Sequence, residues 1–313
     1  MKWKSHRVFQ PGVFALLFLL TFSVTGCVSP TPNPTGNPSR SPGTPTIQAA
    51  TSTPLQPEPT QTSIPLAAEV NGDGIPLAEY QTGLAQLQAA QMKLGRSDSP
   101  EAQRQKVLDD LIVSTLLAQA AFQAGYKISE SELDQRIARL AQESGGESAL
   151  AAWKSSQGFT PETFRQSLKR SLAANWQRDQ IFAAVPQTAD QVHARQILVY
   201  NKEDADHALG KLIPGIDFAT LAYQYDPVTG GDLGWFPIGY LTDPAVEAAA
   251  FSLQPGEISQ VIEGKVGFHI IQVIERDPHR PLSPGARLAL QQKAFQEWVS
   301  THREQSKITI SVP

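Results

Sequence analysis

The sequence predicts an α+β protein in which a small sheet-containing unit is inserted into a helical scaffold. Three observations support this fold class. Residues 67–185 carry helical periodicity with clear capping signals. Residues 192–277 contain two glycine clusters and short runs that alternate like strands. A last helix pattern begins at Ser283 and ends in a strand-like segment, and this pair cannot bury its apolar face alone.

The N-terminus has the features of a secretory signal. Basic residues precede an apolar run from Val13 to Leu20, which is shorter than the roughly 20 residues that a transmembrane helix needs. The run is followed by Val24-Thr25-Gly26-Cys27, which resembles the bacterial lipobox. That resemblance implies a lipoprotein signal peptide over residues 1–27, with Cys27 lipidated and the chain anchored on the extracytoplasmic face of a bacterial membrane. An ordinary cleaved signal with an incidental cysteine is the alternative.

Cys27 is the only cysteine of the chain. No disulfide can therefore form within the chain, and packing alone must stabilise the folded part. Residues 28–66 are rich in Pro, Thr, Ser, Asn and Gly and carry almost no charge. Such a segment cannot bury enough apolar surface to offset its ordering entropy. We expect a disordered tether, which either gives reach through a cell wall or acts as a passive spacer.

Residues 67–189 predict an all-α domain. Residues 68–75 contain a turn signal before a first helix near residues 78–94. Three later helices have clear starts, at Ser99 before Pro100, at the capping box of Ser129 and Glu132, and at Thr160 before Pro161. The glycine at residue 125 and the proline at residue 186 are expected to end two of these helices.

The C-terminal segment, residues 279–313, repeats the helical pattern. Ser283-Pro284 starts a helix to about Glu304, and Lys307–Val312 alternates like a short strand. One helix and one strand cannot bury that apolar face by themselves. We expect this segment to pack on the first helical domain, which makes the sheet-containing unit an insertion between two halves of one scaffold.

The inserted unit carries four motifs in order over roughly 90 residues, the size of a small domain. The motifs are Ala194-Arg195-Gln196-Ile197-Leu198-Val199, Gly230-Gly231-Asp232-Leu233-Gly234-Trp235-Phe236, Leu253-Gln254-Pro255-Gly256-Glu257-Ile258-Ser259 and Gly267-Phe268-His269-Ile270-Ile271. This order resembles the parvulin family of peptidyl-prolyl isomerases. The resemblance implies a domain over residues 190–278 with a four-stranded sheet and surrounding helices.

The wider arrangement resembles the bacterial envelope chaperones related to SurA and PrsA. In those proteins a helical chaperone domain is built from N- and C-terminal segments around a parvulin domain. The resemblance implies that residues 67–189 form such a chaperone domain and that residues 279–313 complete it. It also implies that the clients are unfolded or proline-containing exported polypeptides.

The chemistry that this resemblance implies requires no cofactor. Rotation about an X-Pro bond faces a barrier of about 18–20 kcal/mol because the amide is conjugated, so a catalyst needs only to favour the twisted amide. The sequence shows no phosphate-binding glycine loop, no metal-ligand spacing and no nucleophile elbow. A net charge of −4 gives no reason to expect nucleic acid as a partner. We therefore expect neither a metal nor a cofactor.

The candidate catalytic residues follow from the family motifs. His269 matches the histidine of the closing strand, and Asp226 lies nearest the position that holds a cysteine or an aspartate. Gln196 stands where the family usually has a second histidine; its amide can hold the ring of His269 but cannot titrate. Core burial of His269 and a turn role for Asp226 before Pro227 are the structural alternatives.

The resemblance also implies an apolar pocket for the proline ring. Its candidate residues are Phe236, Leu241, Trp235 and Phe268. A further aromatic position of the family's pocket corresponds to Ala245, which weakens the case for an efficient enzyme. Trp235 and Phe236 are expected to be partly core and partly pocket.

Two functions remain open from the sequence. In the first, the protein is a membrane-tethered extracytoplasmic peptidyl-prolyl cis-trans isomerase that assists the folding of exported proteins, for which proline isomerisation is a slow step. In the second, it is a holdase that binds unfolded peptides, and its parvulin-like domain has little or no activity. The sequence does not set the oligomeric state.

Overall fold

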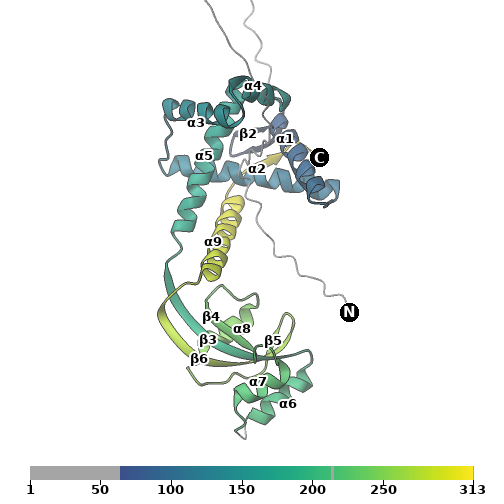
Figure 1. Ribbon diagram of the computed structural model, residues 1–313, viewed down its shortest axis with the longest axis vertical. Coiled ribbons are helices and arrows are strands. Elements are labelled where there is room, and N and C mark those ends of the chain that lie inside the picture. The colour runs from purple at the N-terminus through teal and green to yellow at the C-terminus, as the bar shows by residue number, and fades with distance from the viewer. Residues whose placement is uncertain (1–63, 213–214, 313) are drawn as a thin grey trace, which may run out of the picture.

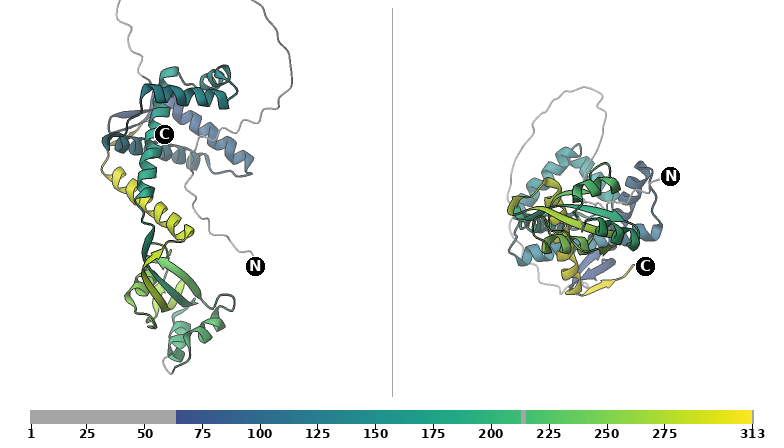
Figure 2. Two further views of the ribbon diagram at one scale, coloured as in Figure 1. Left: turned by 60° about the vertical axis from the view of Figure 1, so that its left-hand side comes forward. Right: turned by 90° about the horizontal axis from the view of Figure 1, so that it is seen from below.

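The computed structural model describes residues 64–212 and 215–312 of the chain (Figure 1). The predicted signal peptide, Cys27 and all but the last few residues of the predicted tether lie outside the described residues. A helical part and a sheet-containing part lie at opposite ends of the long axis, and two segments connect them (Figures 1 and 2). Within the described residues, every helix is too short or too polar to cross a bilayer.

The helical part contains five consecutive helices. They are α1 (Leu77–Lys93), α2 (Pro100–Gln123), α3 (Glu130–Glu143), α4 (Glu147–Ser156) and α5 (Pro161–Ala183). The expected helix starts are confirmed, because the Ser99 side chain accepts a hydrogen bond from the Ala102 amide and both Ser129 and Thr160 form capping boxes. The contact of Phe159 with Phe164, whose ring centroids are 5.9 Å apart, fixes the entry into α5.

A small sheet lies within this helical part and corrects the expectation of an all-α domain. Its strands are β1 (Leu66–Val70), β2 (Asp73–Pro76) and β7 (Ile308–Ile310), in the order β2-β1-β7. The predicted turn over residues 68–75 is a hairpin. Asn71 and Gly72 both have positive φ (53° and 93°), as a two-residue hairpin loop requires. Val70 and Ile75 are fully buried against α2.

The inserted unit contains the expected four-stranded antiparallel sheet. Its strands are β3 (Thr188–Val199), β4 (Asp232–Pro237), β5 (Ile262–Gly264) and β6 (Gly267–Pro281), in the order β4-β3-β6-β5. Its helices are α6 (Lys202–Leu212), α7 (Phe218–Tyr225) and α8 (Pro244–Ser252). The parvulin-like fold of this unit is confirmed.

Alternation along the strands gives the sheet two buried faces. Ile197 and Ile270 point to one face, where they pack against α6 and α7. Val192, Phe236 and Ile271 point to the other face, where they pack against α8. Side chains alternate along a strand. His269 therefore lies on the α8 face, whereas its neighbours Phe268 and Ile270 lie on the face covered by α6 and α7.

The insertion is confirmed by contacts between the two ends of the scaffold. Helix α9 (Pro284–Glu304) follows β6 and returns to the helical part, as Figure 2 shows. The Phe295 ring lies 6.2 Å from the Phe182 ring of α5. Strand β7 then pairs with β1, with Ala68 opposite Ile310. The chain enters and leaves the inserted unit at neighbouring positions, because Thr188 pairs with Pro281.

This arrangement predicts that the inserted unit can be removed. Residues 190–279 are replaced by a short glycine-serine linker, which has to span only about 5 Å between paired strands. We expect the scaffold to remain folded, with cooperative thermal unfolding by circular dichroism and helical content in proportion to its remaining helices.

A matched protein that also lacks residues 305–313 is the control for the role of β7. Removing β7 exposes β1, so this protein should unfold at a lower temperature than the first. An excised scaffold without a cooperative transition would contradict the insertion.

Candidate active site

His269 occupies the centre of the α8 face of the sheet and is only 4% exposed. Its Nδ1 lies 2.9 Å from Oε1 of Gln196 on the neighbouring strand β3. The ring donates its Nδ1–H to the amide oxygen, because that oxygen can only accept. The expected contact between Gln196 and His269 is therefore present, and it fixes the orientation of the imidazole.

The second ring nitrogen of His269 is buried without a hydrogen-bond partner. Burial lowers the pKa of His269 below its ordinary value, and the charge of the Asp243 carboxylate opposes that shift in pKa. The imidazole is thus neutral at pH 7, with its proton on Nδ1 and a lone pair on Nε2.

Gly264 keeps this edge of the ring accessible to the Asp243 carboxylate. A Cβ atom at Gly264 would lie 2.7 Å from Nε2 of His269 and 2.5 Å from Oδ2 of Asp243. Such distances are too short for any side chain. The glycine therefore allows β5, the ring and the carboxylate to approach one another closely.

Asp243 was not among the residues expected from the sequence. It is the N-cap of α8, where its carboxylate accepts hydrogen bonds from the Ala245 amide (3.1 Å) and the Lys265 amide (2.5 Å). The pKa of Asp243 is lowered mainly by the Lys265 N–H. The position before Pro244 repeats the pattern of Ser99 before Pro100, so the cap could have been found from the sequence. Its proximity to His269 could not.

A short loop, residues 238–243, connects β4 to α8 and is named the site loop here. The buried carboxylate of Glu247 accepts hydrogen bonds from the amides of Gly239, Tyr240 and Leu241, at 2.8 to 3.0 Å. One side chain thus holds three consecutive backbone groups of the loop. Sequence analysis missed Glu247 because these partners are backbone atoms.

Apolar side chains share this face of the sheet with His269. Leu233, Leu241 and Ile262 are half-buried and pack against the core of the α8 face. Ile262 pairs directly with His269 across β5 and β6. Leu241, which the sequence predicted for the proline pocket, shares this apolar surface with Leu233 and Ile262.

Phe236 lies beneath this surface. It is 0% exposed, and its ring packs edge-on against Phe251 at 6.1 Å. The expected direct contact of Phe236 with a proline ring is not available in this structure. The residue instead supports Leu241 and its neighbours from below. The sequence identified the correct face of the strand but not the depth of the side chain.

Two other expected pocket residues lie away from His269. Trp235 pairs with His193, and their ring centroids are 5.6 Å apart; the Arg280 guanidinium lies 4.0 Å from the Trp235 ring. Phe268 packs into the cluster beneath α6 and α7. Both residues therefore occupy the opposite side of the sheet, and their expected contact with substrate is not supported by this geometry.

Asp226 forms the turn that follows α7. Its carboxylate accepts hydrogen bonds from the Val228 and Thr229 amides, and the Thr229 hydroxyl is the main cause of its lowered pKa. The same turn brings Gly231 against β3, where the backbone N–H of Gln196 donates a hydrogen bond to the Gly231 carbonyl at 2.8 Å. A Cβ atom at Gly231 would lie 1.9 Å from the backbone carbonyl oxygen of Gln196. Asp226 therefore supports the strand of Gln196 through the turn.

The geometry suits an apolar ligand better than a metal or a charged group. Among residues 64–212 and 215–312, no cluster of His, Cys, Asp and Glu could hold a metal ion. The His269–Gln196 pair offers one fixed, neutral imidazole beside an apolar surface.

Two models of protein families match the chain. Residues 52–177 match the SurA-like N-terminal domain, and residues 180–277 match the PPIC-type PPIase domain. The second match covers β3, β4, β5, His269 and β6 as far as residue 277, and it lies between α5 and α9 except for the last residues of α5.

Curated relatives include proteins named foldase protein PrsA and chaperone SurA. The foldase protein PrsA of Geobacillus kaustophilus is 31% identical over 55% of this chain and 62% of its own length. The chaperone SurA of Methylobacillus flagellatus is 36% identical over 39% of this chain and 33% of its own length. The chain thus covers less than two thirds of either protein.

A solved structure was also found. The peptidylprolyl isomerase PrsA from Bacillus cereus is 22% identical over 75% of this chain and 87% of its own, with a TM-score of 0.43. This overall similarity is too low to carry an argument about the site. The two domain matches and the described fold agree in content and order: a region similar to the SurA-like N-terminal domain is followed by a region similar to the PPIC-type PPIase domain.

Proposed function

We propose that this protein is a peptidyl-prolyl cis-trans isomerase and folding chaperone for exported polypeptides, tethered outside the cytoplasm by lipid on Cys27. The observation that supports the isomerase most is the neutral His269, held by Gln196 at 2.9 Å beside the apolar surface of Leu233, Leu241 and Ile262. This is the environment that an X-Pro amide needs if its twisted form is to be favoured.

The physical basis is differential stabilisation of the twisted amide. A planar amide is conjugated and polar, so water stabilises it, whereas a twisted amide has lost much of that charge separation. Binding the proline ring against Leu241 and its neighbours removes water from the amide. Selective binding of the twisted form lowers the rotational barrier without covalent chemistry. Because His269 is only 4% exposed, its proposed role is to support this surface from beneath, with the neutral ring held in a fixed position by Gln196.

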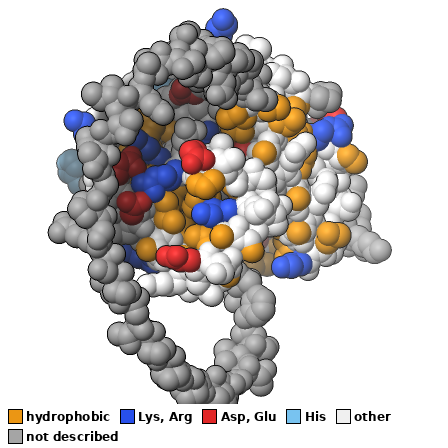
Figure 3. Space-filling model, turned by 90° about the horizontal axis from the view of Figure 1, so that it is seen from above, with side chains coloured by type: hydrophobic (Ala, Val, Ile, Leu, Met, Phe, Trp, Pro, Cys, Tyr) orange, Lys and Arg blue, Asp and Glu red, His pale blue; other side chains and the backbone are white. Residues whose placement is uncertain are grey.

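The helical part is proposed to bind unfolded clients. Met92 and Leu94 at the end of α1 are 75% and 68% exposed, and Phe122 at the end of α2 is 42% exposed. Met92 and Leu94 are two residues apart, and contiguous exposed apolar side chains mark surfaces that bind other apolar groups. Figure 3 shows apolar side chains between charged ones on the helical end of the molecule.

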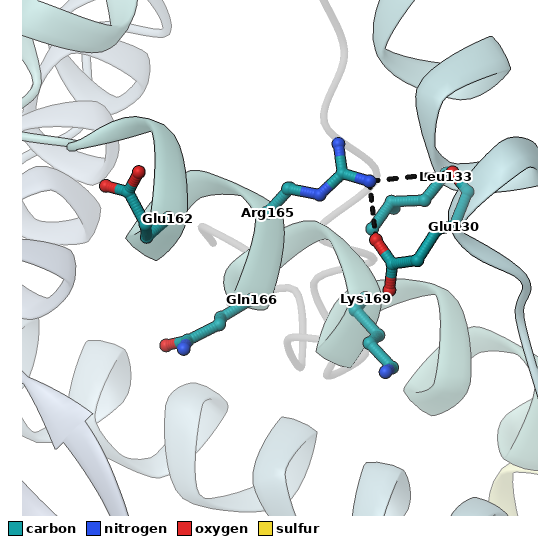
Figure 4. Close-up of a pocket in the computed structure, with 6 residues that line it drawn as sticks. All are labelled: Glu130, Leu133, Glu162, Arg165, Gln166 and Lys169. Carbon is teal, nitrogen blue, oxygen red and sulfur yellow. Dashed lines mark hydrogen bonds and ion pairs between the residues drawn. The ribbon is translucent and has the colours of Figure 1, made fainter. Parts of the chain in front are cut away.

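A hollow between charged side chains on the same part is a poorer candidate for the clients. It has a volume of about 230 Å³ and lies between α3 and α5 (Figure 4). Arg165 points across it to Glu130 and also binds Asp134, each at 2.5 Å. Since charged groups line the hollow, an apolar client segment would have to displace water from them.

A second candidate function is that of a holdase with little isomerase activity. Two observations favour it. Gln196 cannot titrate, so the site lacks a second ionisable ring beside His269. Ala245 is exposed and offers only a methyl group where a larger side chain would deepen the apolar surface.

The first prediction of the isomerase proposal concerns Leu241 and Phe236. Leu241→Ala should lower kcat/KM in a protease-coupled proline peptide assay about tenfold while the domain remains folded. Phe236→Ala should instead destabilise the domain by about 3–5 kcal/mol, because it leaves a cavity in the core.

Tyr200→Ala is the matched control, since Tyr200 is 83% exposed and lies at the end of β3. Its activity and stability should equal those of the unmodified protein. A Leu241→Ala protein with unchanged kcat/KM would contradict the proposed proline-binding surface.

The second prediction concerns the pH dependence of stability. Because the folded state lowers the pKa of His269 below the ordinary value of about 6.5, the unfolded chain binds the proton more tightly. The contribution of His269 to stability should be full above pH 6.5 and should decrease as the pH falls toward its folded pKa. Urea unfolding of the wild type and of His269→Asn, measured between pH 7.5 and 5, tests this. If both proteins lose the same stability on acidification, the neutral state assigned to His269 is wrong.

The third prediction concerns the lipid anchor. Cys27→Ser should move the protein from the membrane fraction to the soluble fraction, because lipidation needs the thiol. Cell fractionation and immunoblotting measure the distribution, with Ser23→Ala as a neighbouring control that should stay in the membrane. Substituted protein that remains in membranes would exclude lipid on Cys27 as the only attachment.

A further inference from the structure

Helix α9 is fixed to the helical part from Gln291 to its end. The Gln291 side chain, in the first half of the helix, donates a hydrogen bond to the Phe182 carbonyl of α5. Trp298 packs against the cores on both sides of α2, and Arg303 near its end binds Asp109 at 2.7 Å. The helix therefore moves with the scaffold, although it follows the inserted domain in the chain.

The same helix contacts the site loop of the inserted domain. A Cβ atom at Gly239 would lie 3.3 Å from Cδ2 of Leu290 and 3.1 Å from Cδ of Lys293. Leu290 and Lys293 are one turn apart, so they present one face of α9 to the loop. Gly239 also has a φ of 92°, which a residue with a side chain rarely adopts. The backbone of the loop thus lies directly against α9.

The site loop transmits a shift at Gly239 to the candidate active site. Glu247 binds Gly239, Tyr240 and Leu241 together, so the three residues move as one unit. Leu241 belongs to the proposed proline-binding surface. Asp243, at the end of the loop, lies near the unpartnered nitrogen of His269.

We propose that α9 is a positioning helix for the isomerase, and that Leu290 and Lys293 hold the site loop in the conformation that binds proline. This inference rests on the proposed isomerase function. It makes the active surface depend on the chaperone scaffold, since the face that supports Leu241 belongs to a helix anchored in the other part of the molecule.

The test uses the full chain with both contacts removed, Leu290→Ala with Lys293→Ala. Hydrogen exchange of the Gly239, Tyr240 and Leu241 amides, followed by mass spectrometry, reports the loop without any substrate. We expect exchange about fivefold faster than in the wild type. KM for a proline tetrapeptide should rise about fivefold while kcat changes less than twofold, because the loop shapes binding.

Two matched variants separate positioning from general damage to α9. Leu288→Ala truncates a 53% exposed residue of the same helix and should change neither exchange nor KM. Leu290→Met with Lys293→Arg keeps an apolar and a basic side chain of similar volume and should restore wild-type values.

Each outcome decides the proposal. Unchanged exchange in the double alanine variant would overturn it, and so would faster exchange with an unchanged KM. If the wild type itself turns over no peptide, the proposed isomerase function has failed, and the Kd of the same peptide takes the place of KM. An unchanged Kd would then overturn the positioning role, whereas a weaker Kd together with faster exchange would support it.

Discussion

The antiparallel pairing of β3 with β6 is the interaction on which the rest of the molecule depends. It runs from Thr188 opposite Pro281 to Val199 opposite Phe268, with the register shifting after Ala189 and after His193. At one end it forms the connection to the scaffold, where Gln191 donates hydrogen bonds to the carbonyls of Arg280 and Pro281. At the other end it brings Gln196 beside His269. A single ladder thus sets both the insertion and the geometry of the candidate site.

Glycines allow the backbone to close around that ladder. Gly231 meets the Gln196 carbonyl, and Gly264 lies against the ring of His269, at distances that exclude any Cβ. Glu247 then replaces side-chain packing with three charge-assisted hydrogen bonds to the site loop. The site is therefore built largely from backbone contacts. For this reason, few of the residues that surround it could be recognised from the sequence.

Sequence reasoning succeeded where the signal is local or periodic. The starts of α2, α3 and α5 follow from cap chemistry within four residues, and the strands follow from alternation. The hairpin of β1 and β2 was missed although Asn71-Gly72 is its local signal. Glu247 was missed because its partners are backbone amides, and the proximity of Asp243 to His269 depends on distant segments. Phe236, Trp235 and Phe268 were assigned to a surface whose depth and side the motif alone does not define. Their final places depend on contacts between distant segments.

The pairing of β1 with β7 has a consequence for the order of folding during synthesis. β1 leaves the ribosome early, but its second partner follows the entire inserted domain. Closing so long a loop carries an entropic cost, whereas the contacts within the inserted domain span far shorter stretches of chain. The inserted domain can thus assemble first and bring its two ends together, so that it acts as a template on which the interrupted scaffold is joined.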